Sequence, residues 1–159
     1  MAKPIVTQIT DEIATTLAGI TIANGYQQDA TIERVKVDGN DPKNNMLVVH
    51  PLGKARTNND TISDDPPIME FGQRIEWMQN YVIEGTIQEA KDSGVTIDER
   101  VDTLVADIEK ILMVDIGRGG LAERTILETT DNFLVDRPVA LAVFFSVHYF
   151  TQRNDPYTQ

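Results

Sequence analysis

The chain has 159 residues, 41% of them hydrophobic and 25% charged, proportions typical of a single globular domain that spans residues 1–159. It contains no cysteine, which excludes disulfides, thiolate nucleophiles and cysteine-bound zinc or iron-sulfur clusters. A formal net charge of −11 disfavours nonspecific binding to nucleic-acid phosphates. No apolar run is long enough to span a bilayer and the first residues lack a signal-peptide pattern, so we expect a cytoplasmic protein without membrane contact.

The first predicted element is an amphipathic helix within residues 4–22. Its apolar positions recur at helical spacing and are Ile5, Ile9, Ile13, Leu17 and Ile20. Pro4 suits a first helical turn, and Asn24 with Gly25 can adopt the left-handed backbone that ends a helix.

Residues 31–37 and 46–50 are short β-like stretches and predict a hairpin, whose second strand stops at Pro51. Residues 51–67 are rich in Gly, Asn, Asp and Pro and predict a long mobile loop. Because long loops of compact domains often carry function, we expect this loop to dock a partner through Asn58, Asn59, Asp60, Asp64 and Asp65.

Residues 69–87 alternate between apolar and polar side chains, a period of two that predicts a strand with one buried face. The alternation is longer than an average strand, so either a bend near Gln79 and Asn80 divides it or an arm projects from the sheet. A second amphipathic helix is predicted to begin at Thr96, which forms a capping box with Glu99. Its apolar positions are Val101, Leu104, Val105, Ile108, Ile111 and Leu112.

Residues 117–120 predict a turn, residues 124–130 a strand, and residues 139–150 a final, strongly apolar strand. One side of that strand is wholly apolar, and the other is less polar than a solvated face. Since two helices cannot coat both sides of the sheet, we expect a second copy of the chain to cover part of the second side. The predicted self-association residues are Ala140, Ala142, Phe144, His148 and Phe150. Residues 151–159 are polar and predict an exposed tail or an exchanged arm.

The order of helix, strands, helix and strands indicates an α+β fold. We expect a mostly antiparallel sheet of five or six strands, two main helices on one face and one long loop.

The sequence shows no assembled catalytic, cofactor or metal site. His50 and His148 lack a metal-binding spacing and fit structural positions in strands, and no serine lies in a nucleophile elbow. The turn at 117–120 follows a helix and precedes a strand, the reverse of a phosphate-binding loop. Asp98 and Asp102 suit the polar side of a capped helix. We therefore expect no enzyme, no metal and no cofactor. A Mg²⁺-dependent enzyme using Asp60, Asp64, Asp65 and Asp115, and a small regulatory adaptor, are the alternatives from other classes.

Taken in order, these elements resemble the tail-terminator proteins of long-tailed bacteriophages. The resemblance lies in the arrangement of elements and covers most of the chain. Its parts are an opening helix that runs into residues 23–26, strands at 32–37 and 81–87, a helix containing residues 106–108, a Gly-rich turn before Leu121, and a closing strand at 143–149.

The resemblance implies a structural virion protein that forms a homohexameric ring on the tail tube and stops its polymerisation. It also implies contacts with the tube protein, with the neck or head-tail connector, and with a sheath if the tail contracts. The negative charge suits a lumen through which DNA passes without being bound. The protein would be in the host cytoplasm during assembly. Another connector or tail-completion subunit is the alternative within this class.

Overall fold

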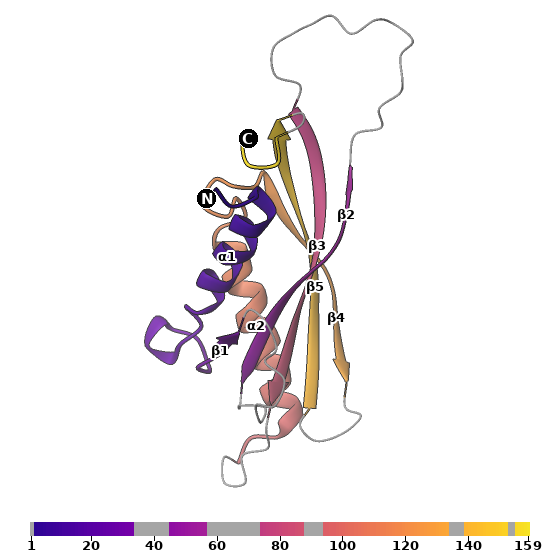
Figure 1. The fold of residues 1–159 in the computed structure, drawn as a ribbon. Coiled ribbons are helices and arrows are strands. Elements are labelled where there is room, and N and C mark those ends of the chain that lie inside the picture. Colours follow the sequence, from indigo (N-terminus) through magenta and orange to yellow (C-terminus); the bar gives the residue numbers. More distant parts are fainter. Residues whose placement is uncertain (1, 34–44, 57–73, 88–93, 134–138, 153–154) are drawn as a thin grey trace, which may run out of the picture.

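The computed structural model describes residues 2–33, 45–56, 74–87, 94–133, 139–152 and 155–159 (Figure 1). In chain order its elements are α1 (Ile5–Leu17), the 3-10 helix η1 (Ile22–Asn24), β1 (Thr31–Glu33), β2 (Met46–Arg56), β3 (Arg74–Ile87), α2 (Ile97–Val114), β4 (Arg124–Phe133) and β5 (Val139–Gln152). The strands form one five-stranded sheet in the order β1-β2-β3-β5-β4. The predicted α+β class is confirmed.

Both helices lie on one face of the sheet, and the other face carries no helix of the described chain (Figure 1). The core between the layers joins the apolar stripes of α1 and α2 to one side of β2, β3 and β5. From the strands it takes Leu47, Val49, Tyr81, Ile83, Ile87, Leu141, Val143, Phe145, Val147 and Tyr149. The apolar side predicted for the last strand therefore faces the helices, as far as its side chains are described.

The two helices begin as their sequences predict. Pro4 is the N-cap residue of α1, which starts at Ile5. Thr96 accepts a hydrogen bond from the Glu99 amide, and the Glu99 carboxylate accepts one from the Thr96 amide, which completes the predicted capping box of α2. α1 ends at Leu17, earlier than the predicted region, and η1 follows with Gly25 in the left-handed conformation.

The predicted hairpin of residues 31–37 with 46–50 is wrong. β1 runs parallel to β2, with Thr31 opposite Met46 and Glu33 opposite Val48, whereas the two strands of a hairpin are antiparallel. β3 takes the antiparallel place beside β2 instead. Local β propensity identified the strands, but their relative direction depends on long-range pairing.

The predicted end of the second strand at Pro51 is also wrong, because β2 continues to Arg56. The pairing between β2 and β3 shifts register between Pro51 and Lys54, and this irregularity accommodates a residue that has no N–H to donate. The side-chain amide of Gln79 donates to the Leu52 carbonyl at 2.6 Å within the irregular stretch. The described part of the predicted loop, residues 51–56, is thus strand, and residues 57–67 lie outside the described chain.

β3 is one continuous strand, paired with β5 at every position from Arg74 to Ile87. No bend divides it at Gln79 and Asn80, and the irregularity there belongs to β2. Gly85 lies between Leu47 on β2 and Leu141 on β5, and a Cβ atom at Gly85 would lie 2.8 Å from the Leu141 side chain. The absence of a side chain at Gly85 therefore lets the two leucines close over β3.

Candidate functional site

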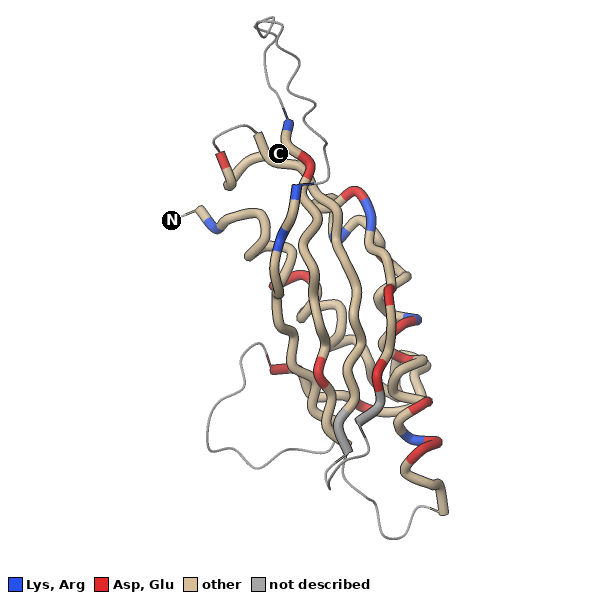
Figure 2. The backbone as a smooth tube through the Cα atoms, turned by 90° about the vertical axis from the view of Figure 1, so that its right-hand side faces the viewer, with Lys and Arg blue, Asp and Glu red and all other residues tan. Residues whose placement is uncertain are grey.

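The side of the sheet that carries no helix of the described chain is the first candidate surface. We call it the open face and define it by the described even-numbered positions of β3 and β5 and their neighbours Val48, His50, Arg124 and Ile126. In Figure 2 this side faces the viewer, and its strands carry few charged residues. Basic positions lie mainly toward the upper end of the sheet and acidic ones toward the lower end.

The open face is already well packed within one chain. Ala142 and His148 are buried, whereas Phe144 and Phe150 are half-buried. Ile126, opposite Ser146 in the sheet, is 39% exposed. The side chain of Ala140 lies outside the described set. A second copy could therefore reach Phe144, Phe150 and Ile126 far better than Ala142 or His148.

Both histidines take strand positions on the open face. The Nδ1 atom of His148 lies 3.2 Å from the Glu76 carboxylate and 3.5 Å from the Arg124 guanidinium. His50 on β2 lies 3.4 Å from the Glu84 carboxylate. These are contacts between neighbouring strands, and their spacing does not make a metal site. Among the described residues, no group of three or more His, Asp or Glu side chains is placed to hold a metal ion.

The Gly-rich segment after α2 is a turn built around a buried cation. Arg118 is fully buried, and its guanidinium donates to the Leu112 carbonyl at 2.8 Å and to the Thr125 hydroxyl at 3.0 Å. Burial lowers the pKa of Arg118, while Asp115 and Glu12 oppose that effect. The amides of Gly117, Gly119 and Gly120 already donate to the Asp115 carboxylate and the Gly117 carbonyl, so they are not available to cradle a phosphate.

The carboxylates considered for metal chemistry have other roles where the structure describes them. Asp115 accepts hydrogen bonds from the amides of Gly117 and Gly119 and so fixes the turn. Asp98 and Asp102 are exposed on the outer side of α2. Asn58, Asn59, Asp60, Asp64 and Asp65 lie outside the described residues.

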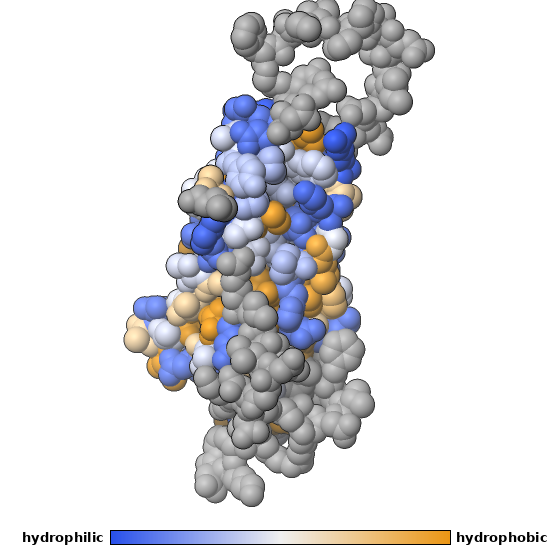
Figure 3. All heavy atoms as spheres, in the orientation of Figure 1, coloured by the Kyte–Doolittle hydropathy of each residue, from blue (hydrophilic) through white to orange (hydrophobic). Residues whose placement is uncertain are grey.

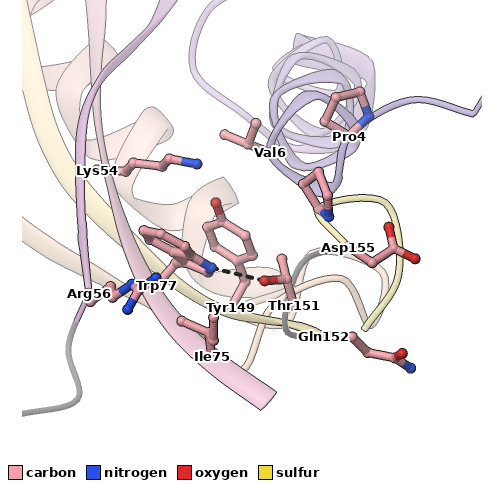
Figure 4. A pocket seen from close by; sticks show the side chains of 11 residues that line it. Pro4, Val6, Lys54, Arg56, Ile75, Trp77, Tyr149, Thr151, Gln152 and Asp155 are labelled. Carbon is pink, nitrogen blue, oxygen red and sulfur yellow. Dashed lines mark hydrogen bonds between the residues drawn. The ribbon is translucent and has the colours of Figure 1, made fainter. Parts of the chain in front are cut away.

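A second candidate surface is a hollow of about 490 Å³ at one end of the molecule (Figure 4). We call it the Trp77 hollow. It is lined by Pro4, Val6, Lys54, Arg56, Ile75, Trp77, Tyr149, Thr151, Gln152, Asp155 and Pro156. The indole N–H of Trp77 donates to the Thr151 hydroxyl at 2.9 Å and so fixes the ring. The Nζ atom of Lys54 lies 4.4 Å, and the guanidinium of Arg56 5.3 Å, from the ring centroid.

The C-terminal residues form one wall of the Trp77 hollow. The Ile5 amide donates to the Pro156 carbonyl at 2.9 Å, which places the end of the chain against the start of α1. Asp155 accepts from the Thr158 hydroxyl at 2.7 Å and from the Tyr157 amide at 2.9 Å, and these bonds lower its pKa. Burial raises the pKa of Tyr149 above the ordinary tyrosine value.

The sequence missed the Trp77 hollow because its parts come from four separate segments. Lys54 and Arg56 lay in the predicted loop, and Gln152, Asp155 and Pro156 lay in the predicted tail. The one available signal was the pair of cations two residues apart, which share a side if residues 54–56 are strand.

The described helices include none long and apolar enough to cross a membrane. On the side seen in Figure 3, hydrophobic surface occurs as small patches among hydrophilic residues.

No protein-family model matches the sequence, and no curated protein matches it either. Among solved structures, the fold is similar to that of a protein described as the PVC sheath/tube terminator, in the extended state of an extracellular contractile injection system. The TM-score is 0.58 at 13% sequence identity, and the match covers 94% of this chain. The chain spans 57% of the length of that terminator chain. The likeness shows that this chain has a terminator-like fold.

Proposed function

We propose that this protein is a structural subunit that assembles as a ring on the end of a tail tube and stops the tube from growing. The observation that carries the proposal is the likeness of nearly the whole chain to a sheath/tube terminator. Because that likeness concerns the fold, the role rests also on the shape of the subunit. A sheet with helices on one side and an open face on the other provides a rigid body with a large surface for a neighbour.

In this proposal the ring is a homohexamer and contacts the tube protein, a sheath where the tail contracts, and the neck or head-tail connector. It belongs to a virion or to a related injection particle. Copies associate through the accessible part of the open face, which includes Phe144, Phe150 and Ile126. The net charge of −11 favours free passage of DNA where DNA is the cargo.

The role is tested by polymerising the tube protein of the same particle with and without this chain and measuring tube lengths by negative-stain microscopy. We expect added chain to appear as a ring at one tube end and to shorten the tubes as its concentration rises. Tubes of unchanged length without end density would contradict the proposal. A ring that binds a connector but not the tube would instead assign the chain to the neck.

The proposed interface is tested by Ile126→Lys, which places a charge on the exposed edge of the open face. The matched control is Val114→Lys at the end of α2, because Val114 is 74% exposed and lies away from the sheet face. We expect Ile126→Lys to abolish rings in microscopy and to keep the chain monomeric in light scattering, whereas Val114→Lys assembles normally. Normal assembly of the Ile126 variant would show that the copies meet elsewhere.

A further inference from the structure

The open face carries charges of opposite sign at its two ends. Arg74 and Arg124, which begin β3 and β4, are exposed at one end. Glu84 and Asp131 are exposed at the other end, where both lie in one row of the sheet because each is opposite Ala142 on β5. Figure 2 shows this separation along the strands. The described part of the face therefore has a basic end and an acidic end.

Contacts within the chain do not remove this separation. At the basic end the Glu76 side chain is 17% exposed, and its carboxylate lies 3.2 Å from His148. Arg124 lies 3.5 Å from the same imidazole ring and is still exposed. At the acidic end the Glu84 side chain is 59% exposed, although its carboxylate lies 3.4 Å from His50. Arg124 and Glu84 are therefore accessible to a second molecule.

Apolar side chains are accessible near the middle of the face. Ile126 is 39% exposed and lies on β4 between Arg124 and Asp131. Phe144 on β5 is half-buried. Glu128, at the register shift of β4, adds an exposed carboxylate in this stretch. Apolar groups at the centre with charges around them are typical of a protein–protein interface.

We propose that two unassembled copies of the chain pair through their open faces, with the basic end of each on the acidic end of the other. A two-fold axis that crosses the strands produces this arrangement, and it brings Arg124 of each copy to Asp131 of the other. The contact then occurs twice, in a two-layer sandwich of sheets. If the strands of both copies ran in the same direction, like charges would face each other and repel.

The pair does not need the ring, but it uses the same face. A cyclic ring joins the open face of one copy to a different surface of the next, whereas the pair joins two identical faces. A copy held in the pair is therefore not available to the ring, and this consequence alone rests on the proposed function.

Net charge limits the strength of the pair. Each copy carries −11, so two copies repel each other at long range. In about 0.1 M salt the screening length is about 10 Å, which weakens repulsion between distant charges more than attraction between charges in contact. Exposed ion pairs contribute little individually, so we expect a weak and reversible pair.

Sedimentation of the full-length chain at about 0.1 M salt, without tubes, tests the proposal. We expect a dimer whose population rises with protein concentration. Arg124→Glu and Asp131→Arg should each weaken dimerisation about tenfold, because a symmetric pair contains each change twice. An equimolar mixture of the two variants should dimerise again, because every mixed pair has one Glu–Arg contact and one original Arg–Asp contact.

Two control variants carry the same changes of net charge. Lys110→Glu and Asp102→Arg alter exposed positions on α2, on the helical side of the sheet. They should leave dimerisation within about twofold of the original, since the long-range effect of two charges is screened. Circular dichroism checks that all four variants fold, as expected for changes at exposed positions.

A single introduced cysteine distinguishes the pair from a ring, because the chain has no other cysteine. Ile126 lies between Arg124 and Asp131 on β4, so in the pair its two copies lie near the two-fold axis. Ile126→Cys should therefore form disulfide-linked dimers in high yield when oxidised with copper phenanthroline. Val114→Cys, at an exposed position on α2, is the control and should give few.

Three results would overturn the proposal. These are a chain that sediments as a monomer up to about 1 mM, a variant mixture that dimerises no better than either variant alone, and equal disulfide yields at positions 126 and 114. The outcome is separate from that of the tube assay. A chain that shortens tubes but never pairs refutes only the pair, and a chain that pairs but leaves tubes unchanged refutes only the terminator role.

Discussion

At the scale of single residues, Arg118 is the most unusual side chain of the described structure. It has a positive φ of 51° and is fully buried, yet it carries a charge. Its bonds to Leu112 and Thr125 connect the end of α2 to the start of β4. The Thr125 hydroxyl in turn donates to the Ile116 carbonyl at 2.9 Å. Arg118 therefore acts as a cap for the helix end, a role for which a cation is well suited.

We expect Arg118→Ala to lower the free energy of unfolding by roughly 3 kcal/mol, because it removes two buried hydrogen bonds and leaves their acceptors unsatisfied. Urea unfolding followed by circular dichroism measures the change. Arg74→Ala, at an exposed position that begins β3, is the control and should cost less than about 0.5 kcal/mol. Equal stability of the two variants would show that the buried guanidinium does not stabilise the fold.

At the scale of elements, the ends of α2 are specified by different kinds of information. The start depends on the local capping box of Thr96 and Glu99, which the sequence displays directly. The end depends on Arg118, which reaches Leu112 from the following turn. A pattern of nearby residues can predict the first arrangement, but the second depends on which way the turn folds.

Thr96→Ala should destabilise the protein by about 1 kcal/mol, because the Glu99 amide loses its acceptor. Thr96→Ser is the matched control, since serine retains the hydroxyl and caps helices at least as well. Thermal unfolding of both variants checks the prediction. Equal destabilisation by serine would attribute the effect to the lost methyl group.

The C-terminal segment should respond to acid. The pKa of Asp155 is lowered by its bonds to the Thr158 hydroxyl and the Tyr157 amide, so these bonds are fully present above the ordinary Asp value of about 3.9. They are lost as pH falls through the depressed folded-state pKa. The protection factor of the Tyr157 amide in hydrogen exchange should fall over that acidic range, and Asp155→Asn should lower it already at neutral pH. Protection that is independent of pH and unaffected by Asp155→Asn would contradict this assignment.

At the scale of the whole molecule, net charge and shape have opposite effects on self-association. The open face offers apolar contact area, but copies that each carry −11 repel one another. Self-association then depends on how well the solvent screens that repulsion.

We expect ring formation by the purified chain to strengthen several-fold when salt rises from about 0.02 M to 0.3 M, over which the screening length falls below about 10 Å. Analytical ultracentrifugation at fixed protein concentration measures this change. Association that weakens with salt would mean that ion pairs between copies outweigh the net repulsion.

How well an element could be predicted depended on how far apart in the sequence its interacting residues lie. The helices, the capping box and the long β3 were recognisable, since each depends on residues within a few positions along the chain. The parallel pairing of β1 with β2 was not recognisable, because β propensity does not specify whether two strands run parallel or antiparallel. The alternation along β5 correctly predicted which of its described side chains face the helices. The burial of Ala142 and His148 on the other side depends on neighbouring strands.

By itself the sequence determined an acidic, cysteine-free α+β domain with two amphipathic helices and an apolar last strand, because composition and periodicity are local properties. The tertiary structure alone decided that β2 passes Pro51, that Arg118 is buried, and that Lys54 and Arg56 meet Trp77. Each of these results depends on strands and turns distant in sequence being brought into contact. The physical reason is that side-chain burial and charge proximity are set by the packed arrangement of the whole chain.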